Sequence, residues 1–372
     1  MLWNHQMIDG SGRIKPCCRF GKNDMPEDNY LQKKSIQDTF YSTWMNELRN
    51  KSINGERITG CARCYQEEDN GKKSLRQRLN DNFMFSIGNA DLENPKIEFL
   101  ELAISNDCNL MCRMCDSRYS WKLYDEEVEY YQKNPAHEKK TRSNIDCAYD
   151  ILHDLKYIKF TGGEPLIIKE HWELLETAIE KGYAKNITLN YSTNCTVWPK
   201  QRIVDIWKKF KKVELAVSLD SIDKNENEYQ RHLTNHEQAI KNILKYADLS
   251  KTEINMQLIA RPTVSIMNVY TIPETVEWLE ENNISANPSH VTYPDWQSVT
   301  VLPEKDKMLI KEKYENFDFS CEKTKTHCMY IVNYMMSKDD SSLLNKFIDH
   351  TSFLDKKRNQ SFKNIYSYFS FK

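Results

Sequence analysis

The sequence predicts an α/β protein with a mostly parallel sheet, and two observations lead to this prediction. Between residues 96 and 291, short apolar runs alternate with amphipathic stretches, as expected when strands are joined by helical crossovers. Polar or glycine-rich residues follow each of the first five apolar runs. In parallel α/β folds, functional residues collect at the carboxyl ends of the strands. The pattern therefore predicts both the fold class and the edge of the sheet that carries the site.

The apolar runs and the stretches between them define the expected elements. The strand candidates are residues 97–104, 157–160, 187–191, 213–219, 254–259 and 284–287. The helix candidates are residues 121–132, 149–155, 171–181, 201–210, 236–246 and 272–281. Six units are too few for a full eight-stranded barrel. An open doubly wound sheet is one alternative that periodicity does not separate from a partial barrel.

Composition narrows the class of protein. The chain of 372 residues has 52 basic and 54 acidic side chains, so it lacks the basic excess of a nucleic-acid-binding protein. It contains no apolar run near the ~20 residues that span a bilayer, and its first residues do not resemble a signal peptide. We therefore expect a cytoplasmic protein with no membrane partner. Eleven cysteines in such a chain indicate metal or redox chemistry rather than disulfides.

Three cysteines directly follow the first strand candidate. Cys108, Cys112 and Cys115 lie in the stretch C-N-L-M-C-R-M-C. Three thiolates on one short loop can hold three irons of a cubane cluster and leave the fourth iron open for a small molecule. The alternatives are a structural zinc loop or three buried thiols. Zinc normally takes four ligands, and the next candidate ligand along the chain is His137.

The C-x3-C-x2-C spacing, with Met114 before the third cysteine, resembles the radical S-adenosylmethionine (radical SAM) superfamily. The resemblance implies a [4Fe-4S] cluster on the three cysteines, with SAM bound to the open iron. It implies reductive cleavage of SAM to a 5′-deoxyadenosyl radical that abstracts hydrogen from a substrate. It also implies a partial (β/α)6 TIM-like barrel at residues 81–300, between a small N-terminal cysteine-containing module at 1–80 and a helical C-terminal extension at 301–372.

The stretch after the second strand candidate matches a SAM-binding motif of the family. Gly162, Gly163, Glu164 and Pro165 correspond to the family's G-G-E-P, which binds the SAM amino group. Glycines permit close backbone approach to a ligand, and a carboxylate accepts hydrogen bonds from an ammonium group. Taken alone, Gly-Gly indicates a plain strand-to-helix turn.

Other candidate SAM contacts follow the later strands. Ser192 and Asn194 resemble the family's S-T-N-G turn, with Cys195 in place of glycine, where a Cβ disfavours positive φ. The resemblance assigns Ser218 and Asp220 to the ribose, for which helix capping is the alternative. The resemblance also assigns Arg231 to the SAM carboxylate, for which a surface helix arginine is the alternative. It places Met114 and Ile259 against adenine, for which core packing is the alternative.

A second cysteine group, Cys17, Cys18, Cys61 and Cys64, lies near the amino terminus. Turn residues at 9–16 precede the first pair, and a predicted helix at 44–53 precedes the second pair. Four thiols suit zinc or an iron–sulfur cluster. The W-x4-I-D-x2-G-x4-C-C pattern followed by C-x2-C resembles SPASM/twitch modules, which implies an auxiliary iron–sulfur cluster. Adjacent side chains diverge, so we expect Cys18, Cys61 and Cys64 as ligands, with Cys17 next.

These patterns lead to a functional hypothesis. We expect a radical SAM oxidoreductase or modifying enzyme that acts on a peptide or protein, with a carbohydrate or small metabolite as the second choice. Its expected electron donor is a flavodoxin or ferredoxin. The alternative from another class is a zinc-stabilised binding scaffold that performs no chemistry.

Overall fold

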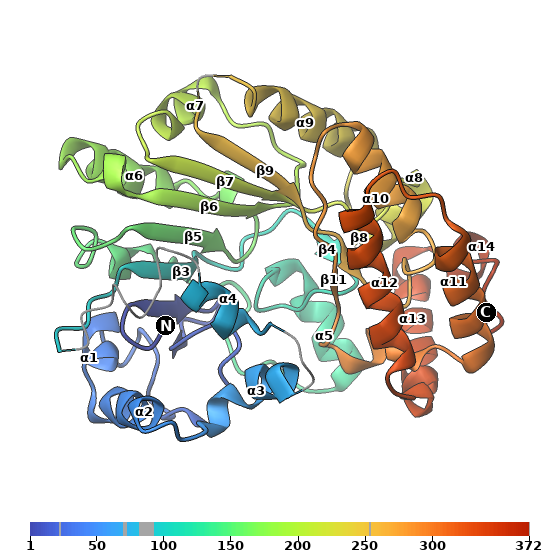
Figure 1. Ribbon diagram of the computed structural model, residues 1–372, viewed down its shortest axis with the longest axis horizontal. Helices are drawn as coiled ribbons and strands as arrows, with labels where there is room; N and C mark the ends of the chain where they lie inside the picture. Colours follow the sequence, from blue (N-terminus) through green and yellow to red (C-terminus); the bar gives the residue numbers. More distant parts are fainter. Residues whose placement is uncertain (22–23, 70–72, 82–92, 253, 372) are drawn as a thin grey trace. The chain divides into compact units, whose positions relative to one another are not determined.

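A computed structural model describes residues 1–21, 24–69, 73–81, 93–252 and 254–371. Seven strands form one sheet in the order β2-β1-β3-β5-β6-β7-β9 (Figure 1). The pairs β1–β3, β3–β5 and β5–β6 are parallel, and β1–β2 is antiparallel. The predicted α/β class with a mostly parallel sheet is therefore confirmed.

The chain divides into two interleaved compact units. Unit 1 comprises Met1–Asp107, His137–Tyr191 and Gln201–Val213, and unit 2 comprises Cys108–Ala136, Ser192–Lys200 and Glu214–Lys372. The chain passes from one unit to the other inside β6 (Thr188–Thr193) and β7 (Lys212–Val217). The predicted domain boundaries at residues 80 and 300 stay a prediction.

Unit 1 contains most of the sheet. Its strands, besides the first parts of β6 and β7, are β1 (His5–Ile8), β2 (Ile14–Lys15), β3 (Phe99–Ala103) and β5 (Tyr157–Thr161). Its α-helices are α1 (Ile36–Phe40), α2 (Thr43–Ile53), α3 (Ala62–Asp69), α4 (Leu75–Asp81), α6 (Glu170–Glu180) and α7 (Gln201–Trp207). Its 3-10 helices are η2 (Thr59–Cys61), η5 (Ile145–Ala148), η6 (Pro165–Ile167) and η7 (Ala184–Asn186).

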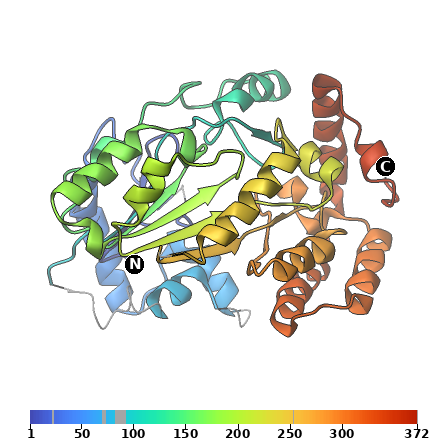
Figure 2. The same ribbon diagram turned by 90° about the horizontal axis from the view of Figure 1, so that it is seen from above.

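The period of two along the strands separates two faces of the sheet in unit 1. Phe160 and Tyr191 occupy one face, where rings of α6 and α7 contact them: the Tyr191 ring lies 5.7 Å from His171 and 5.5 Å from Trp207. Figures 1 and 2 show α6 beside β5 and β6. Polar side chains lie on the opposite face, among them Glu101 of β3 and Lys159 of β5, which are opposite each other in the parallel register.

Unit 2 is mostly helical. Besides the last parts of β6 and β7, its strands are β4 (Met111–Cys112), β8 (Arg231–His232), β9 (Met256–Ala260), β10 (Thr263–Val264) and β11 (Ser289–His290). Its α-helices are α5 (Tyr124–Tyr131), α8 (Lys224–Gln230), α9 (His236–Leu249), α10 (Ile272–Glu281), α11 (Glu304–Asn316), α12 (Glu322–Met336), α13 (Leu344–Arg358) and α14 (Phe362–Ile365). Its 3-10 helices are η4 (Trp121–Leu123), η8 (Asp295–Gln297), η9 (Val299–Val301) and η10 (Ser341–Leu343). Helix α11 packs on α12, and α13 on α5.

Most predicted elements are present, and two differ. Residues 149–155 form successive i→i+3 turns instead of a helix, in a stretch that contains Asp150 and Asp154, and Asp is a poor helix former. The sixth strand candidate, 284–287, is reduced to a single parallel bridge between Ala260 and Ala286. Pro288 follows it, and proline has no N–H for a ladder. Strand β1, with the sequence HQMI, was not predicted and adds to the sheet beside β3.

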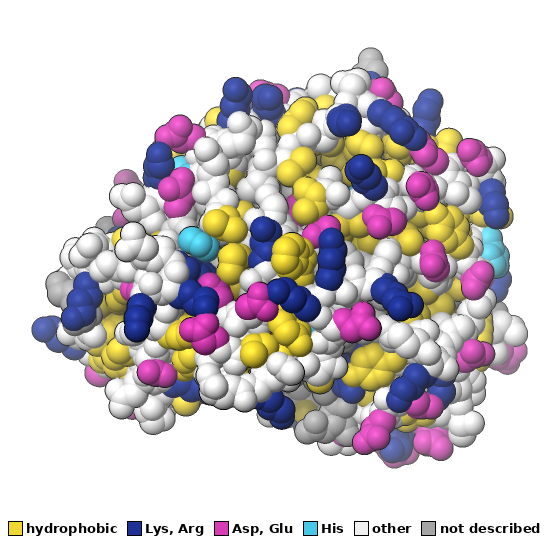
Figure 3. Space-filling view, turned by 180° about the vertical axis from the view of Figure 1, so that it is seen from behind, with side chains coloured by type: hydrophobic (Ala, Val, Ile, Leu, Met, Phe, Trp, Pro, Cys, Tyr) yellow, Lys and Arg dark blue, Asp and Glu magenta, His cyan; other side chains and the backbone are white. Residues whose placement is uncertain are grey.

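The surface and the helix lengths bear on the expected partners. On the face drawn in Figure 3, basic and acidic side chains are interspersed, in keeping with a formal net charge of −2. Among the described residues, no helix is both long and apolar enough to cross a membrane.

Candidate active site

The three central cysteines lie in unit 2, in the segment that follows β3. Cys112 belongs to β4, which pairs antiparallel with β8 so that Cys112 lies opposite Arg231. A tight turn follows, in which the Cys115 N–H donates to the Cys112 carbonyl at 3.1 Å. All three thiols, including that of Cys108, belong to half-buried residues. The loop is therefore held by a strand pair from a distant part of the chain.

Two side chains place N–H donors near these thiols. Arg231 Nη1 lies 3.9 Å from Cys112 Sγ, and Asn194 Nδ2 lies 4.0 Å from Cys108 Sγ. Asn194 is oriented by its neighbours, since its Nδ2 also donates to Asn109 Oδ1 at 2.9 Å. The next residue, Cys195, has φ of 61°, so the turn keeps the left-handed conformation that we expected a Cβ to disfavour.

Arg231 is held by a buried ion pair. Its Nε donates to Asp220 Oδ2 at 2.7 Å, and the Asp220 residue is fully buried. The other oxygen, Oδ1, accepts from the Thr263 N–H at 2.7 Å. Burial acts to lower the pKa of Arg231, but Asp220 and Cys112 raise it by more, so the arginine stays charged. This geometry favours a positioning role for Asp220, and its predicted contact with ribose stays a prediction.

The Gly-Gly-Glu-Pro turn lies in unit 1, where it fits against the segment that leads into the cysteine loop. A Cβ at Gly163 would lie 1.8 Å from the Asp107 carbonyl oxygen. The Glu164 N–H donates to that same oxygen at 2.8 Å. At Gly162, φ is +104°, a conformation that favours glycine. Both glycines are thus required by a close backbone approach inside the protein, before any ligand is considered.

The remaining predicted SAM contacts have the following environments. Glu164 is buried, and its Oε1 caps η6 by accepting from the Leu166 N–H at 3.1 Å. The Ser218 N–H donates to the Thr193 carbonyl at 3.0 Å. Pro165 is buried, whereas Ser192, Ser218, Met114 and Ile259 are half-buried. Their roles in SAM binding stay predictions.

The donor set of the cysteine loop fits an iron–sulfur cluster chemically. Burial is the main cause that raises the pKa of Cys112 and of Cys115, so without a cation the thiols stay protonated. Among the described residues, no three His, Cys, Asp or Glu side chains are arranged around one metal ion. A single zinc ion needs all its ligands at one centre. A cubane takes one cysteine per iron, which is compatible with thiols that do not converge on a point.

The amino-terminal cysteines line a small cavity in unit 1 of about 80 Å³. Cys17, Cys61 and Cys64 face it together with aromatic and basic side chains, whereas Cys18 is not among its lining residues. Burial, and then the charges of Cys17 and Cys64, raise the pKa of Cys61 to about 12. Cys17, Cys61 and Cys64 thus share one cavity, whereas the expected ligand order, with Cys18 ahead of Cys17, stays a prediction.

The surroundings of the cysteine loop include residues that the sequence did not single out. Asn268 Nδ2 donates to the Asp220 carbonyl at 2.8 Å and supports the ion pair with Arg231. Arg113, within the motif itself, reaches Asp355 on α13 at 2.6 Å. Its place inside C-R-M-C is the only sequence signal for this contact, because its partner lies 242 residues away.

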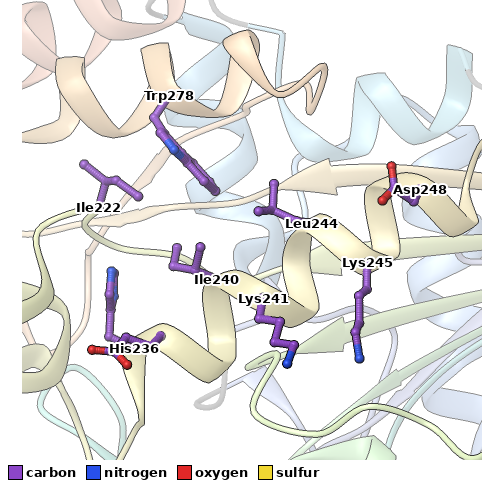
Figure 4. Close-up of a pocket in the computed structure, with 9 residues that line it drawn as sticks. Ile222, His236, Ile240, Lys241, Leu244, Lys245, Asp248 and Trp278 are labelled. Atoms are coloured by element: carbon purple, nitrogen blue, oxygen red, sulfur yellow. The ribbon is translucent and has the colours of Figure 1, made fainter.

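A separate apolar groove on unit 2 lies between α9 and α10 (Figure 4). Ile240 and Leu244 of α9 and Trp278 of α10 line it, and none of the predicted site residues does. It therefore adds nothing to the candidate active site.

The fold and the cysteine loop together define a parallel α/β protein with a thiol-rich site after a strand of its sheet. Residues 102–279 match the family model described as "Radical SAM superfamily", so this segment of the chain is a radical SAM domain. Members of the superfamily use a [4Fe-4S] cluster and SAM.

Individual relatives are similar over part of their length. GTP 3′,8-cyclase of Actinobacillus pleuropneumoniae serotype 3 is 29% identical over 185 residues, 49% of this chain and 48% of the relative. The radical SAM cyclopropyl synthase TigE of Paramaledivibacter caminithermalis is 28% identical over 210 residues, 51% of this chain and 40% of the relative. The chain thus matches about half the length, or less, of these curated relatives.

Among solved structures, Streptococcus suis SuiB bound to S-adenosylmethionine has a TM-score of 0.39 and 19% identity, covering 69% of this chain and 57% of SuiB. The protein anSMEcpe with bound AdoMet and a Cp18Cys peptide has a TM-score of 0.37 and 18% identity, covering 60% of this chain and 61% of the other.

Proposed function

We propose that the protein holds a [4Fe-4S] cluster on Cys108, Cys112 and Cys115 and cleaves SAM reductively to abstract hydrogen from a substrate. The observation that carries this proposal is the β4–β8 pair, which sets the charged Arg231 beside the Cys112 thiol. Cys108, Cys112 and Cys115 would hold the cluster, which would supply the electron for reductive cleavage of SAM to methionine and a 5′-deoxyadenosyl radical. An external reductant of the flavodoxin or ferredoxin class would provide that electron.

The chain's own residues perform binding and orientation. Arg231 and Asn194 direct N–H groups at the Cys112 and Cys108 sulfurs, which favours the thiolate form that ligates iron. Asp220 fixes the guanidinium through a 2.7 Å bond. From the family resemblance, Glu164 binds the SAM amino group and Arg231 the SAM carboxylate. The cavity of Cys17, Cys61 and Cys64 holds an auxiliary cluster.

The proposed substrate is a peptide or protein, because the amino-terminal cysteine pattern resembles SPASM/twitch modules, whose enzymes often modify peptides or proteins. A small metabolite is the second candidate, and the match to GTP 3′,8-cyclase is the observation that favours it.

The central test uses the anaerobically reconstituted protein and a chemical reductant. Cys112→Ala should abolish formation of 5′-deoxyadenosine from SAM, and Cys108→Ala and Cys115→Ala should act alike, because the loss of one ligand destabilises the whole cluster. Cys147→Ala is the matched control, since Cys147 is a half-buried cysteine of η5 outside both groups. Normal 5′-deoxyadenosine formation by any of the three variants would refute the proposal, and stoichiometric zinc without iron in the parent protein would favour a scaffold.

The substrate class is tested with an extract of cells grown in deuterated medium. The extract is separated into a peptide and protein fraction and a small-metabolite fraction, and each is incubated with enzyme and unlabelled SAM. Hydrogen abstraction moves deuterium from the substrate into 5′-deoxyadenosine, which mass spectrometry detects. Label from the small-metabolite fraction alone would overturn the preference for a peptide or protein.

A further inference from the structure

Two buried arginine side chains connect helix α13 of unit 2 with the cysteine loop. One extends from the loop to the helix, and the other extends from the helix to the loop. Arg113, from the loop, donates through Nη2 to Asp355 of α13 at 2.6 Å. Arg358, the last residue of α13, donates through Nη1 to the Met111 carbonyl of the loop at 2.9 Å. Met111 and Arg113 are the two neighbours of Cys112. The residues on both sides of this one cysteine therefore contact the same helix, Met111 through its carbonyl and Arg113 through its side chain.

Each arginine is buried and supported by further partners. The Arg358 side chain is 2% exposed and forms a two-pronged ion pair with Glu126 of α5, at 3.1 and 2.6 Å. The Arg113 side chain is also 2% exposed, and its guanidinium lies 3.6 Å from the centre of the Tyr229 ring. Removing one partner of such a pair leaves a buried charge, so these contacts strongly determine the loop geometry.

Asp355 is the point at which several segments meet. Its Oδ1 accepts from Arg113 and from the Tyr229 hydroxyl at 2.7 Å, and its Oδ2 accepts from the Phe362 N–H at 2.6 Å. On the loop side, the Arg113 carbonyl accepts from Gln297 Nε2 at 2.6 Å. The loop, α8, α13 and the start of α14 thus share one polar network.

We infer that Arg113, Asp355 and Arg358 are positioning residues for Cys112, so that the C-terminal helix α13 forms part of the support of the cluster. This inference rests on the proposed function, in which Cys112 ligates iron. Side chains that orient a metal ligand from outside the first coordination sphere also affect metal affinity, and their substitution typically weakens it about 10- to 100-fold.

The test compares Asp355→Asn and Arg358→Leu with Lys356→Ala, an exposed position on the same helix. In the apo-protein, hydrogen exchange of peptides covering residues 108–116 should become at least about tenfold faster in the first two variants and stay unchanged in the third. In the reconstituted protein, iron loss to a chelator should become about 10- to 100-fold faster. Arg358→Lys should restore part of the protection.

The outcomes separate this inference from the proposed function. Unchanged loop exchange and iron retention in Asp355→Asn and Arg358→Leu would overturn the role of α13, while loss of the cluster in Cys112→Ala would leave the proposed function standing. Formation of 5′-deoxyadenosine by Cys112→Ala would refute the proposed function itself. If Arg358→Leu also exposes peptides of β3 and β5, it has lost its fold, and Asp355→Asn, which keeps the size of the side chain, decides the question.

Discussion

The two cysteine groups of the protein are held by different means. The central loop is fixed by polar contacts from far along the chain, among them the pairs Arg231–Cys112 and Arg113–Asp355. The amino-terminal cysteines Cys17, Cys61 and Cys64 instead line a cavity formed by nearby elements, with Trp3, Phe20 and Tyr65 in its wall. Basic side chains, Arg19 and Arg76, line the same cavity. The central loop therefore depends on partners from distant parts of the sequence, whereas the amino-terminal cavity is built from residues of the first 80 positions.

The largest effect on the central group is expected from a substitution that disturbs the backbone just before Cys108. Gly163→Ala should destabilise the apo-protein by at least about 3 kcal/mol and abolish SAM cleavage, because its Cβ would meet the Asp107 carbonyl. Gly182→Ala is the matched control: its φ is +75° but its Cβ meets nothing within 4 Å. We expect the control to cost about 1 kcal/mol. Urea unfolding and 5′-deoxyadenosine formation measure both effects, and equal costs for the two variants would contradict the close approach.

The second test separates the two groups directly. Cys61→Ala with Cys64→Ala should remove about half of the iron, because one of two clusters is lost. Cleavage of SAM should continue, while turnover of the substrate stops. Cys17→Ala should lose the same iron and Cys18→Ala should keep it, since only Cys17 lines the cavity. Iron analysis with product detection checks this, and loss of all iron would show that the groups are interdependent.

A smaller effect is expected when the negative charge of Asp220 is removed and all cysteine ligands are kept. Asp220→Asn should retain the cluster but weaken SAM binding about tenfold, roughly 1.4 kcal/mol, because Arg231 loses its anchor. It should also raise the cluster potential, since a negative charge near Cys112 is removed. The control is Asp248→Asn, which removes the same charge at an exposed position on α9. Unchanged SAM affinity and potential in Asp220→Asn would refute the positioning role.

A further effect, on stability alone, concerns acid unfolding near the amino-terminal group. Burial lowers the pKa of His5 to about 3 despite attraction by Glu101, so the folded ring stays neutral below the ordinary value of 6.5. Protonation of the unfolded chain then removes stability as the pH falls from 6.5 towards 3. At pH 5 the loss is about 2 kcal/mol. The variant His5→Phe, which can keep the ring stacked on Phe99, should lack this loss of stability. The control His153→Gln, at an exposed histidine, should show the same loss as the parent protein. Urea unfolding at pH 6.5 and at pH 5 measures both.

The sequence predicted features whose cause is local. Five apolar runs became β3, β5, β6, β7 and β9, and the cysteine spacing identified the superfamily. Strand β1 was missed because it is short and half of its residues, His5 and Gln6, are polar, so no apolar run marks it in the sequence. Whether Cys17 or Cys18 lines the cavity was not predictable from the sequence, because the cavity is formed with residues near position 60 rather than with sequence neighbours alone.

The contacts of the central loop were beyond prediction for a related reason. Nothing near Arg113 indicates that its partner is Asp355, because ion pairs have no sequence period. Asp220 illustrates the converse: the motif drew attention to the residue, while its surroundings assign both carboxylate oxygens to Arg231 and Thr263. Motifs identify which residues matter, and tertiary partners determine what they do.

The parallel pairing of β1 with β3 has a consequence for synthesis of the chain. His5 lies opposite Phe99, so β1 has no parallel partner until much of the polypeptide has left the ribosome. Unit 1 is completed only by residues up to Val213, after the first segment of unit 2 has been made. Such non-local contacts slow folding. The residues that line the amino-terminal cavity all lie between Met1 and Asn80, so they leave the ribosome before the sheet of unit 1 is complete.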